Sequence, residues 1–109
     1  MRLQPSISRR AEADLTSQYH WYRDNAGAQV AEQFLIMFDS TLARLAEIPT
    51  LGRPRKFRDP DLAGIRSLAL GGKFGAHLIF YRSDEADLSI VRVMHGARDL
   101  PRRLSEAPE

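Results

Sequence analysis

The sequence predicts an α+β fold in which a helix hairpin packs on one face of a small, mainly antiparallel sheet. Apolar residues recur at helical spacing through residues 9–48, whereas β-branched and aromatic residues form strand-like runs through residues 65–94. Helices and strands are therefore segregated along the chain, as they are in α+β proteins. With a short apolar segment in front of the first helix, the predicted order is β-α-α-β-β-β.

The first strand is predicted at residues 3–8, and the first helix begins directly after it. Ser8 is expected to cap this helix, because a serine side chain accepts a hydrogen bond from the free N–H groups of the first turn. Glu12 and Asp14 follow early in the helix, where the helix dipole favours acidic side chains. The face that this helix turns to the core is predicted to carry Ala11, Leu15, Tyr19 and Tyr22.

The second helix has the strongest apolar periodicity in the chain. Asn25-Ala26-Gly27 separates it from the first helix, and this short break predicts an antiparallel hairpin. Pro49 ends the second helix, because the residue before a proline avoids the α conformation. Ile36 and Met37 are predicted to point away from the core-facing stripe. That stripe consists of Ala31, Phe34, Leu35, Phe38, Leu42 and Leu45.

Residues 50–64, rich in Pro, Gly, Arg and Asp, are predicted to form a loop. Three strands follow at residues 65–70, 77–82 and 88–94, and short connections join them into an antiparallel meander. The helix hairpin covers one face of this sheet, so the other face is expected to be open to solvent or to a partner. The segment 98–104 is compatible with a short helix or with an extended tail.

Alternation along the last strand predicts which side chains share a face of the sheet. Val91, Val93 and His95 are placed on one face, and Ile90, Arg92 and Met94 on the other.

The composition is that of one soluble domain, predicted to span residues 1–109. The chain has no cysteine, which excludes disulfides, thiolate metal sites and a thiol nucleophile. No apolar run approaches the ~18 residues that a membrane-spanning helix needs. The first residues also lack the apolar core of a signal peptide. We therefore expect a cytoplasmic protein with no membrane contact.

The formal net charge of +2 is distributed unevenly along the chain. Residues 1–52 carry a net charge of −1, whereas residues 53–82 carry seven basic and two acidic side chains, a net charge of +5. A second cationic group comprises Arg92, Arg98, Arg102 and Arg103. Such a surface suits phosphate or an acidic protein, and a solvated arginine-rich loop is the alternative interpretation.

The residues offer little conventional catalytic chemistry. The three histidines lie on different elements without metal-ligand spacing, so we expect no metal and no cofactor. One group has catalytic potential, and it comprises Arg66, Lys73, Tyr81, His95 and Arg98. In a metal-independent endoribonuclease, His95 and Tyr81 would transfer protons while the three cations stabilise phosphate charge. A structural His95 and a core Tyr81 are equally compatible with the strand pattern.

Several segments resemble, in the same order along the chain, the RelE/ParE superfamily of small toxins, and in particular its ParE branch. They are Ala11-Glu12-Ala13-Asp14-Leu15, Ile48-Pro49-Thr50-Leu51-Gly52-Arg53, Ile65-Arg66-Ser67-Leu68, His77-Leu78-Ile79-Phe80-Tyr81-Arg82 and Ile90-Val91-Arg92-Val93-Met94-His95-Gly96-Ala97-Arg98-Asp99-Leu100. The last segment is the most specific. The resemblance implies the β-α-α-β-β-β fold and the toxin role of a type II toxin–antitoxin pair.

The ParE resemblance implies an inhibitor of DNA gyrase that acts by protein–protein binding rather than by catalysis. It also implies a ParD-like antitoxin, encoded beside the toxin, whose C-terminal segment wraps and neutralises it. Plasmid stabilization is the associated role, and relatives without toxicity exist. In this interpretation nucleic acid is contacted only indirectly. The polar contacts with partners would come from Arg66, Arg82, Arg92, Arg98, Arg102 and Arg103, because arginine forks suit carboxylates.

The alternative implied by the RelE branch is a ribosome-dependent endoribonuclease that cuts messenger RNA. Arg66 and Arg98 fall at positions similar to those of catalytic arginines in that branch. The basic pair that those enzymes carry ahead of the sheet has Arg55 and Lys56 as its nearest counterparts. The segment around His95 resembles the ParE form instead.

Overall fold

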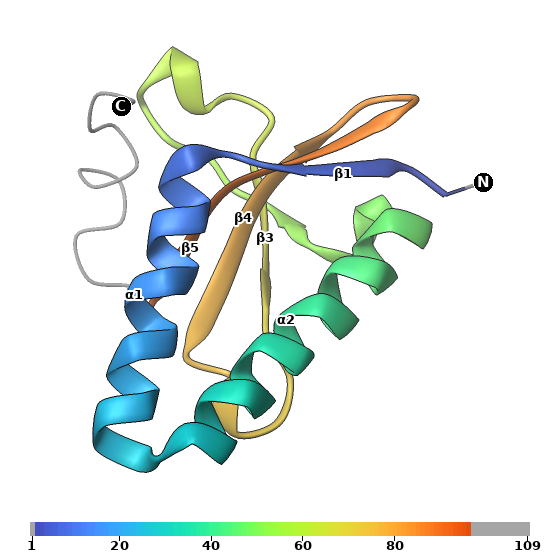
Figure 1. Cartoon of the computed structure of the whole chain (residues 1–109). Coiled ribbons are helices and arrows are strands. Elements are labelled where there is room, and N and C mark those ends of the chain that lie inside the picture. Colours follow the sequence, from blue (N-terminus) through green and yellow to red (C-terminus); the bar gives the residue numbers. More distant parts are fainter. Residues whose placement is uncertain (1, 97–109) are drawn as a thin grey trace.

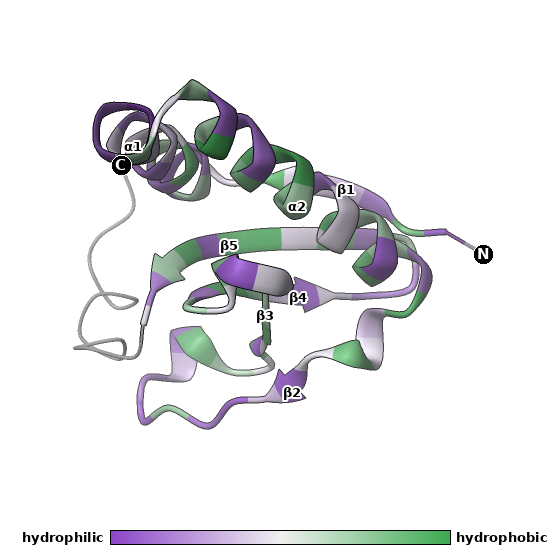
Figure 2. Ribbon diagram, turned by 90° about the horizontal axis from the view of Figure 1, so that it is seen from below, coloured by the Kyte–Doolittle hydropathy of each residue, from purple (hydrophilic) through white to green (hydrophobic). Residues whose placement is uncertain are grey.

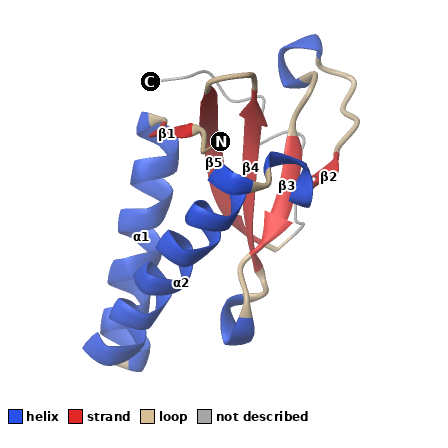
Figure 3. Ribbon diagram, turned by 90° about the vertical axis from the view of Figure 1, so that its right-hand side faces the viewer, coloured by secondary structure: helices blue, strands red, loops and turns tan. Residues whose placement is uncertain are grey.

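The computed structural model describes residues 2–96, in which two long helices pack on one face of a five-stranded sheet (Figures 1 and 3). The helices are α1 (Arg9–Ala26) and α2 (Ala28–Glu47). The strands are β1 (Gln4–Ile7), β2 (Arg53–Pro54), β3 (Arg66–Ala69), β4 (His77–Ser83) and β5 (Asp87–His95). Three short 3₁₀ turns lie in the connections, at Pro49–Leu51, Pro60–Leu62 and Gly72–Phe74. The predicted α+β class and the predicted order of helices and strands are confirmed, with β2 as an additional strand.

The strands lie in the order β1-β5-β4-β3-β2. The meander of β3, β4 and β5 is antiparallel, as predicted, and β2 continues it on the outer side of β3. β1 pairs with β5 in parallel, from Gln4 opposite Asp87 to Ile7 opposite Ile90. β2 falls inside the predicted loop 50–64, because a two-residue strand that contains a proline shows no alternation to detect.

α1 begins at the predicted cap and ends at the predicted break. The Ser8 hydroxyl accepts a hydrogen bond from the N–H of Ala11 at 3.0 Å and donates one to the C=O of Val91 in β5 at 2.8 Å. Gly27 stands alone between the two helices with a φ of 101°, a conformation that residues with a side chain rarely adopt. The cap therefore fixes the start of α1 to the sheet, and the glycine makes the sharp turn of the hairpin.

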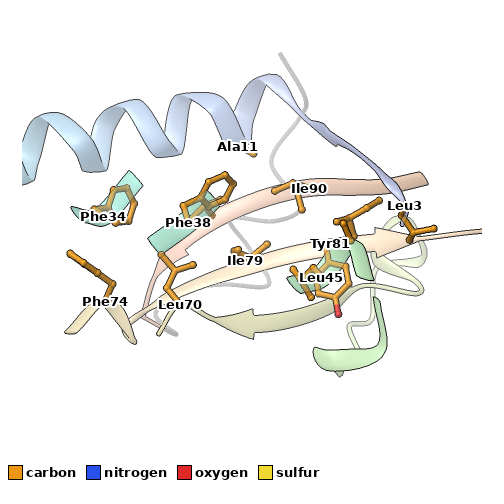
Figure 4. Packing of buried hydrophobic residues seen from close by; sticks show 13 residues of the cluster. Leu3, Ala11, Phe34, Phe38, Leu45, Leu70, Phe74, Ile79, Tyr81 and Ile90 are labelled. Carbon is orange, nitrogen blue, oxygen red and sulfur yellow. The ribbon is translucent and has the colours of Figure 1, made fainter. Parts of the chain in front are cut away.

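α2 turns its apolar stripe to the sheet, as predicted. Phe34, Phe38 and Leu45 are buried and gather with Ile79 of β4 in the core (Figure 4). Each such side chain contributes roughly 1.5–3 kcal/mol when it is fully buried. Met37 also packs against the core, so its predicted outward direction is wrong. Within residues 2–96, neither α1 nor α2 has the apolar length that a membrane-crossing helix requires.

β5 contains a bulge that reverses the alternation of its side chains. The pairing of β4 with β5 shifts between Phe80 and Tyr81, because β5 has one more residue than β4 at that point. Ile90 and Val93 consequently both pack under the helices, while Val91 packs against the opposite face. The predicted faces of Ile90 and Val91 are therefore wrong, since strict alternation holds only in a strand without an inserted residue.

The second face of the sheet is covered rather than open. The loop between β2 and β3 folds across it, and Leu62 and Ile65 pack there against Phe80 and Met94. Figure 2 shows the helices on one side of the sheet and the β2 segment with its loop on the other. The prediction that this face is open is therefore wrong. The arginine-rich loop carries enough apolar side chains to form a second small core on it.

Candidate partner-binding surface

The predicted site residues are spread over the sheet rather than gathered at one point. Arg66, Lys73, Tyr81, Arg82, Arg92 and His95 lie in the described part of the chain. Arg98, Arg102 and Arg103 lie outside the described residues. His95 pairs with His77, four residues before Tyr81 on β4, which corresponds to roughly 13 Å along the strand. The proton-transfer pair proposed for a ribonuclease is therefore not assembled.

Tyr81 and Arg66 both bind the backbone at Gly52, where the chain leaves α2. The Tyr81 hydroxyl accepts a hydrogen bond from the N–H of Gly52 at 2.8 Å and donates one to the C=O of Pro49 at 2.6 Å. Nη1 of Arg66 donates to the C=O of Gly52 at 2.7 Å. Tyr81 is completely buried, and burial raises the pKa of its hydroxyl despite opposing effects of the Gly52 hydrogen bond and the Arg66 charge. The hydroxyl thus serves the core and is not placed to give a proton to a substrate.

Arg82 holds the loop on the second face of the sheet. Its Nε donates to the C=O of Ala63 at 3.1 Å, and its Nη2 donates to the C=O of Asp61. The Arg82 side chain remains partly exposed at the edge of this loop, where a partner can reach it.

Arg92 is enclosed in the fold by an ion pair with Asp14 of α1. Nε and Nη2 of Arg92 each lie 2.9 Å from a carboxylate oxygen of Asp14, and the N–H of Val93 donates to the same carboxylate at 2.9 Å. The Arg92 side chain is only 6% exposed. β1 pairs with β5 only as far as Ile90. The N–H of Val93 therefore has no partner in β1, and Asp14 takes that place. The Arg92 side chain therefore offers little surface to a partner in this structure.

A pair of histidines lies where the start of β4 meets the end of β5, beside Tyr22 of α1. The Tyr22 hydroxyl and Nε2 of His77 form a 2.8 Å hydrogen bond, and the rings of His77 and His95 meet edge to face with 5.0 Å between their centres. His77 is completely buried, and burial together with the nearby charge of His95 lowers its pKa to about 4. Nδ1 of His77 is buried and has no hydrogen-bond partner among the described residues.

A groove of about 530 Å³ runs between α1 and the end of β5. It is lined by Asp14, Gln18, Trp21, Tyr22, Val93, Met94 and His95. Trp21 is 56% exposed, a large apolar side chain left at the surface. His95 is the one predicted site residue that lines this groove in the described part of the chain. Trp21 was not among the predicted site residues, although a tryptophan off the apolar face of a helix is a sequence signal for a surface contact.

Lys73 lies apart from both Tyr81 and the groove. It sits in the connection between β3 and β4, where Nζ is 5.6 Å from the centre of the Phe74 ring. Arg53 belongs to the cationic stretch, and Arg55 was also named as a counterpart of the basic pair of the RelE branch. Both arginines border a second groove together with residues of β3 and β4. In the sequence, the feature that pointed to these two arginines was the net charge of +5 in residues 53–82.

The chain was compared with known protein families and with solved structures. Residues 6–100 match the family described as "ParE toxin of type II toxin-antitoxin system, parDE". Toxin ParE1 of Caulobacter vibrioides is 33% identical over 90 residues, which cover 82% of this chain and 84% of that protein. Toxin ParE1 of Mycobacterium tuberculosis is 32% identical over 99 residues, covering 90% of this chain and 94% of that protein.

The fold is shared with toxins of solved toxin–antitoxin complexes. A chain of the chromosomal ParDE system of P. aeruginosa superposes with a TM-score of 0.70 at 21% identity, covering 88% of this chain and 98% of that one. A chain of the RelBE2 toxin–antitoxin complex of Mycobacterium tuberculosis gives a TM-score of 0.59 at 19% identity, covering 87% and 99%. The family match spans nearly the whole chain, and the curated relatives are matched over most of their length. The chain therefore belongs to the ParE toxin family of type II toxin–antitoxin systems, within the RelE/ParE superfamily.

Proposed function

We propose that this toxin inhibits DNA gyrase in the cytoplasm by binding it, and that a ParD-like antitoxin neutralises it. Membership of the ParE family supports the toxin role. The observation that favours binding over catalysis is the use of Tyr81 and Arg66 inside the fold, on the backbone at Gly52. A ribonuclease needs an acid and a base that both reach the substrate, whereas an inhibitor needs only a complementary surface.

Purified toxin and gyrase provide the direct test of this proposal. A supercoiling assay on relaxed plasmid should show loss of activity as the toxin is added, with cleaved DNA accumulating when samples are denatured with detergent. Heat-unfolded toxin serves as the control for non-specific inhibition. Full supercoiling activity at a large molar excess of folded toxin would contradict the proposal.

The antitoxin part of the proposal has its own test. The relatives in solved complexes are paired with antitoxins, which supports a partner of the same kind here. The reading frame beside this gene should encode a short protein that restores growth when it is co-expressed with the toxin and that co-purifies with it. If that product neither rescues growth nor binds, the proposed neutralisation is wrong.

The endoribonuclease alternative retains one favourable observation. His95 is exposed and lines the groove between α1 and β5, so a substrate has access to its ring. In this alternative, His95→Gln removes cleavage of messenger RNA while the fold persists. In the proposed function the same variant remains as toxic to growth as the natural sequence, and primer extension on cellular messages detects no cuts.

A further inference from the structure

A second groove, of about 410 Å³, lies where β2 meets β3. It is lined by Leu51, Arg53, Arg55, Ser67, Leu68, Ala69 and Leu78. It involves neither Trp21 nor His95, which line the groove beside α1. The two grooves therefore offer separate surfaces.

Three leucines make the groove apolar at its base. Leu51, Leu68 and Leu78 are each half-buried, so part of every one of these side chains still meets solvent. Leu51 and Leu68 pack against the main core, whereas Leu78 packs against the small core on the second face of the sheet. The base of the groove therefore lies between the two cores, and covering its exposed apolar surface with an aliphatic side chain would be favourable.

Two arginines border this apolar base. Arg53 is exposed, and the guanidinium of Arg55 lies 5.7 Å from the centre of the Phe80 ring. Burial, and next the charge of Arg53, lower the pKa of Arg55, so the two like charges act on each other. Neither arginine forms an ion pair with an acidic side chain in residues 2–96.

The acidic residues of the same loop are not directed at these arginines. The Asp59 carboxylate accepts a hydrogen bond from the N–H of Asp61 at 2.9 Å and so closes its own turn. The backbone C=O of Asp61 receives the Arg82 side chain. The positive charge at Arg53 and Arg55 is therefore left for a group from outside the described chain.

An aliphatic base beside two guanidinium groups fits one kind of occupant. Carboxylates pair with arginine forks, and a leucine-like side chain covers the apolar base. Single-stranded nucleic acid is a poorer fit, because no aromatic ring lines this groove for a base to stack on. We propose that this groove binds a segment of the antitoxin in which acidic residues flank an aliphatic one, an inference that rests on the proposed antitoxin partner.

The test uses the full-length toxin and the full-length product of the adjacent reading frame. Arg53→Glu and Arg55→Glu should each weaken their association by about tenfold or more in calorimetry, because each places a like charge against the partner's carboxylates. Lys56→Glu and Arg58→Glu are matched controls, since both residues are exposed on the same loop but do not line the groove. These controls should change the dissociation constant by no more than about twofold. Urea midpoints establish that all four variants remain folded.

The outcomes separate the inference from the proposed function. If the natural toxin does not bind the product at all, both the antitoxin partner and this groove are wrong. If it binds, but Arg53→Glu and Arg55→Glu bind equally well or lose no more than the two controls, only the groove assignment is wrong.

A charge reversal in the partner identifies the segment. Fifteen-residue peptides tiled along the product should bind only where acidic and aliphatic residues alternate, and exchanging one of those acids for lysine should restore binding to Arg53→Glu. Binding confined to basic peptides would overturn the inference. Loss of single-stranded RNA binding in Arg53→Glu, with antitoxin binding intact, would assign the groove to nucleic acid and overturn it as well.

Discussion

Asp14 and Arg92 belong to two of the segments that carry the resemblance to ParE toxins, and in the structure these segments meet. The Asp14 carboxylate receives two guanidinium N–H groups of Arg92 and the backbone N–H of Val93. This contact joins the first half of α1 to β5 across 78 residues of chain. It also satisfies a backbone donor at a strand edge, which would otherwise be open.

Asp14→Asn should therefore be strongly destabilising. The substitution removes the carboxylate charge that faces the buried Arg92 guanidinium, and breaking a buried ion pair typically costs about 3–5 kcal/mol. Urea unfolding followed by circular dichroism measures the loss directly.

The matched control is Asp24→Asn, because Asp24 pairs with Arg23 at 3.6 Å on the exposed face of α1. Removing an exposed pair of this kind costs about 1 kcal/mol or less. Equal losses for the two variants would mean that the Asp14 pair contributes no more than a surface pair.

Tyr81→Phe tests the structural role of the hydroxyl at Gly52. The variant leaves the N–H of Gly52 and the C=O of Pro49 without the partner they share, and unpaired buried groups cost about 1–3 kcal/mol each. Tyr19→Phe is the control, since the Tyr19 hydroxyl forms no hydrogen bond within residues 2–96. If Tyr81→Phe has the same free energy of unfolding as Tyr19→Phe but is no longer toxic, the Tyr81 hydroxyl acts in function rather than in stability.

The elements of the fold follow from periodicity, and their exceptions follow from local geometry. The stripe on α2 and the cap at Ser8 were predicted because helical spacing and capping chemistry are local properties. The bulge in β5 and the short strand β2 were missed because each depends on a neighbouring strand rather than on its own sequence. Met37 was misplaced because the Gly71 turn approaches α2 closely, and a methyl group on Gly71 would lie 3.3 Å from the Met37 sulfur.

The candidate site was predicted less well than the fold, for a physical reason. An arginine or a tyrosine looks the same in sequence whether it meets a partner or its own backbone. Arg92 binds Asp14 and Tyr81 binds Gly52, and both partners are distant in the chain. The sequence therefore could not show that these two side chains stabilise the fold. The net charge of residues 53–82 drew attention to the stretch that contains Arg53 and Arg55, because net charge is counted along the chain without regard to contacts.

The contact between α1 and β4 makes the stability of the fold depend on pH. His77 has a pKa of about 4 in the folded protein, below its ordinary value of 6.5, with Tyr22 and His95 as its neighbours. As the pH falls, His77 is therefore protonated in the unfolded chain at a higher pH than in the folded protein, and protonation favours unfolding. The contribution of neutral His77 is complete above pH 6.5 and is lost as the pH falls towards 4.

Between pH 7 and pH 5, the natural protein should lose about 2 kcal/mol more stability than His77→Phe, which has no group to titrate. A phenylalanine suits the site, because the rings of Tyr22 and Phe34 already pack against the His77 ring. Parallel curves for the natural protein and His77→Phe would show that His77 titrates normally in the folded protein.

On the scale of the whole molecule, charge and apolar surface are divided between the two faces of the sheet. The helix hairpin leaves Trp21 and Ile36 exposed, and the opposite side carries the cationic loop with Arg53 and Arg55. The proposed function requires surface for both an antitoxin and gyrase, and two separate surfaces would meet that requirement. This division is consistent with a protein that works by binding.

The central claim is that this toxin stops DNA synthesis rather than translation. The most direct measurement is pulse labelling of DNA and protein synthesis in the minutes after induction from a tightly controlled promoter. Early loss of thymidine incorporation, with amino-acid incorporation maintained and a DNA-damage response induced, is the predicted result. An immediate halt of amino-acid incorporation with cut messages, while thymidine incorporation continues, would contradict the claim.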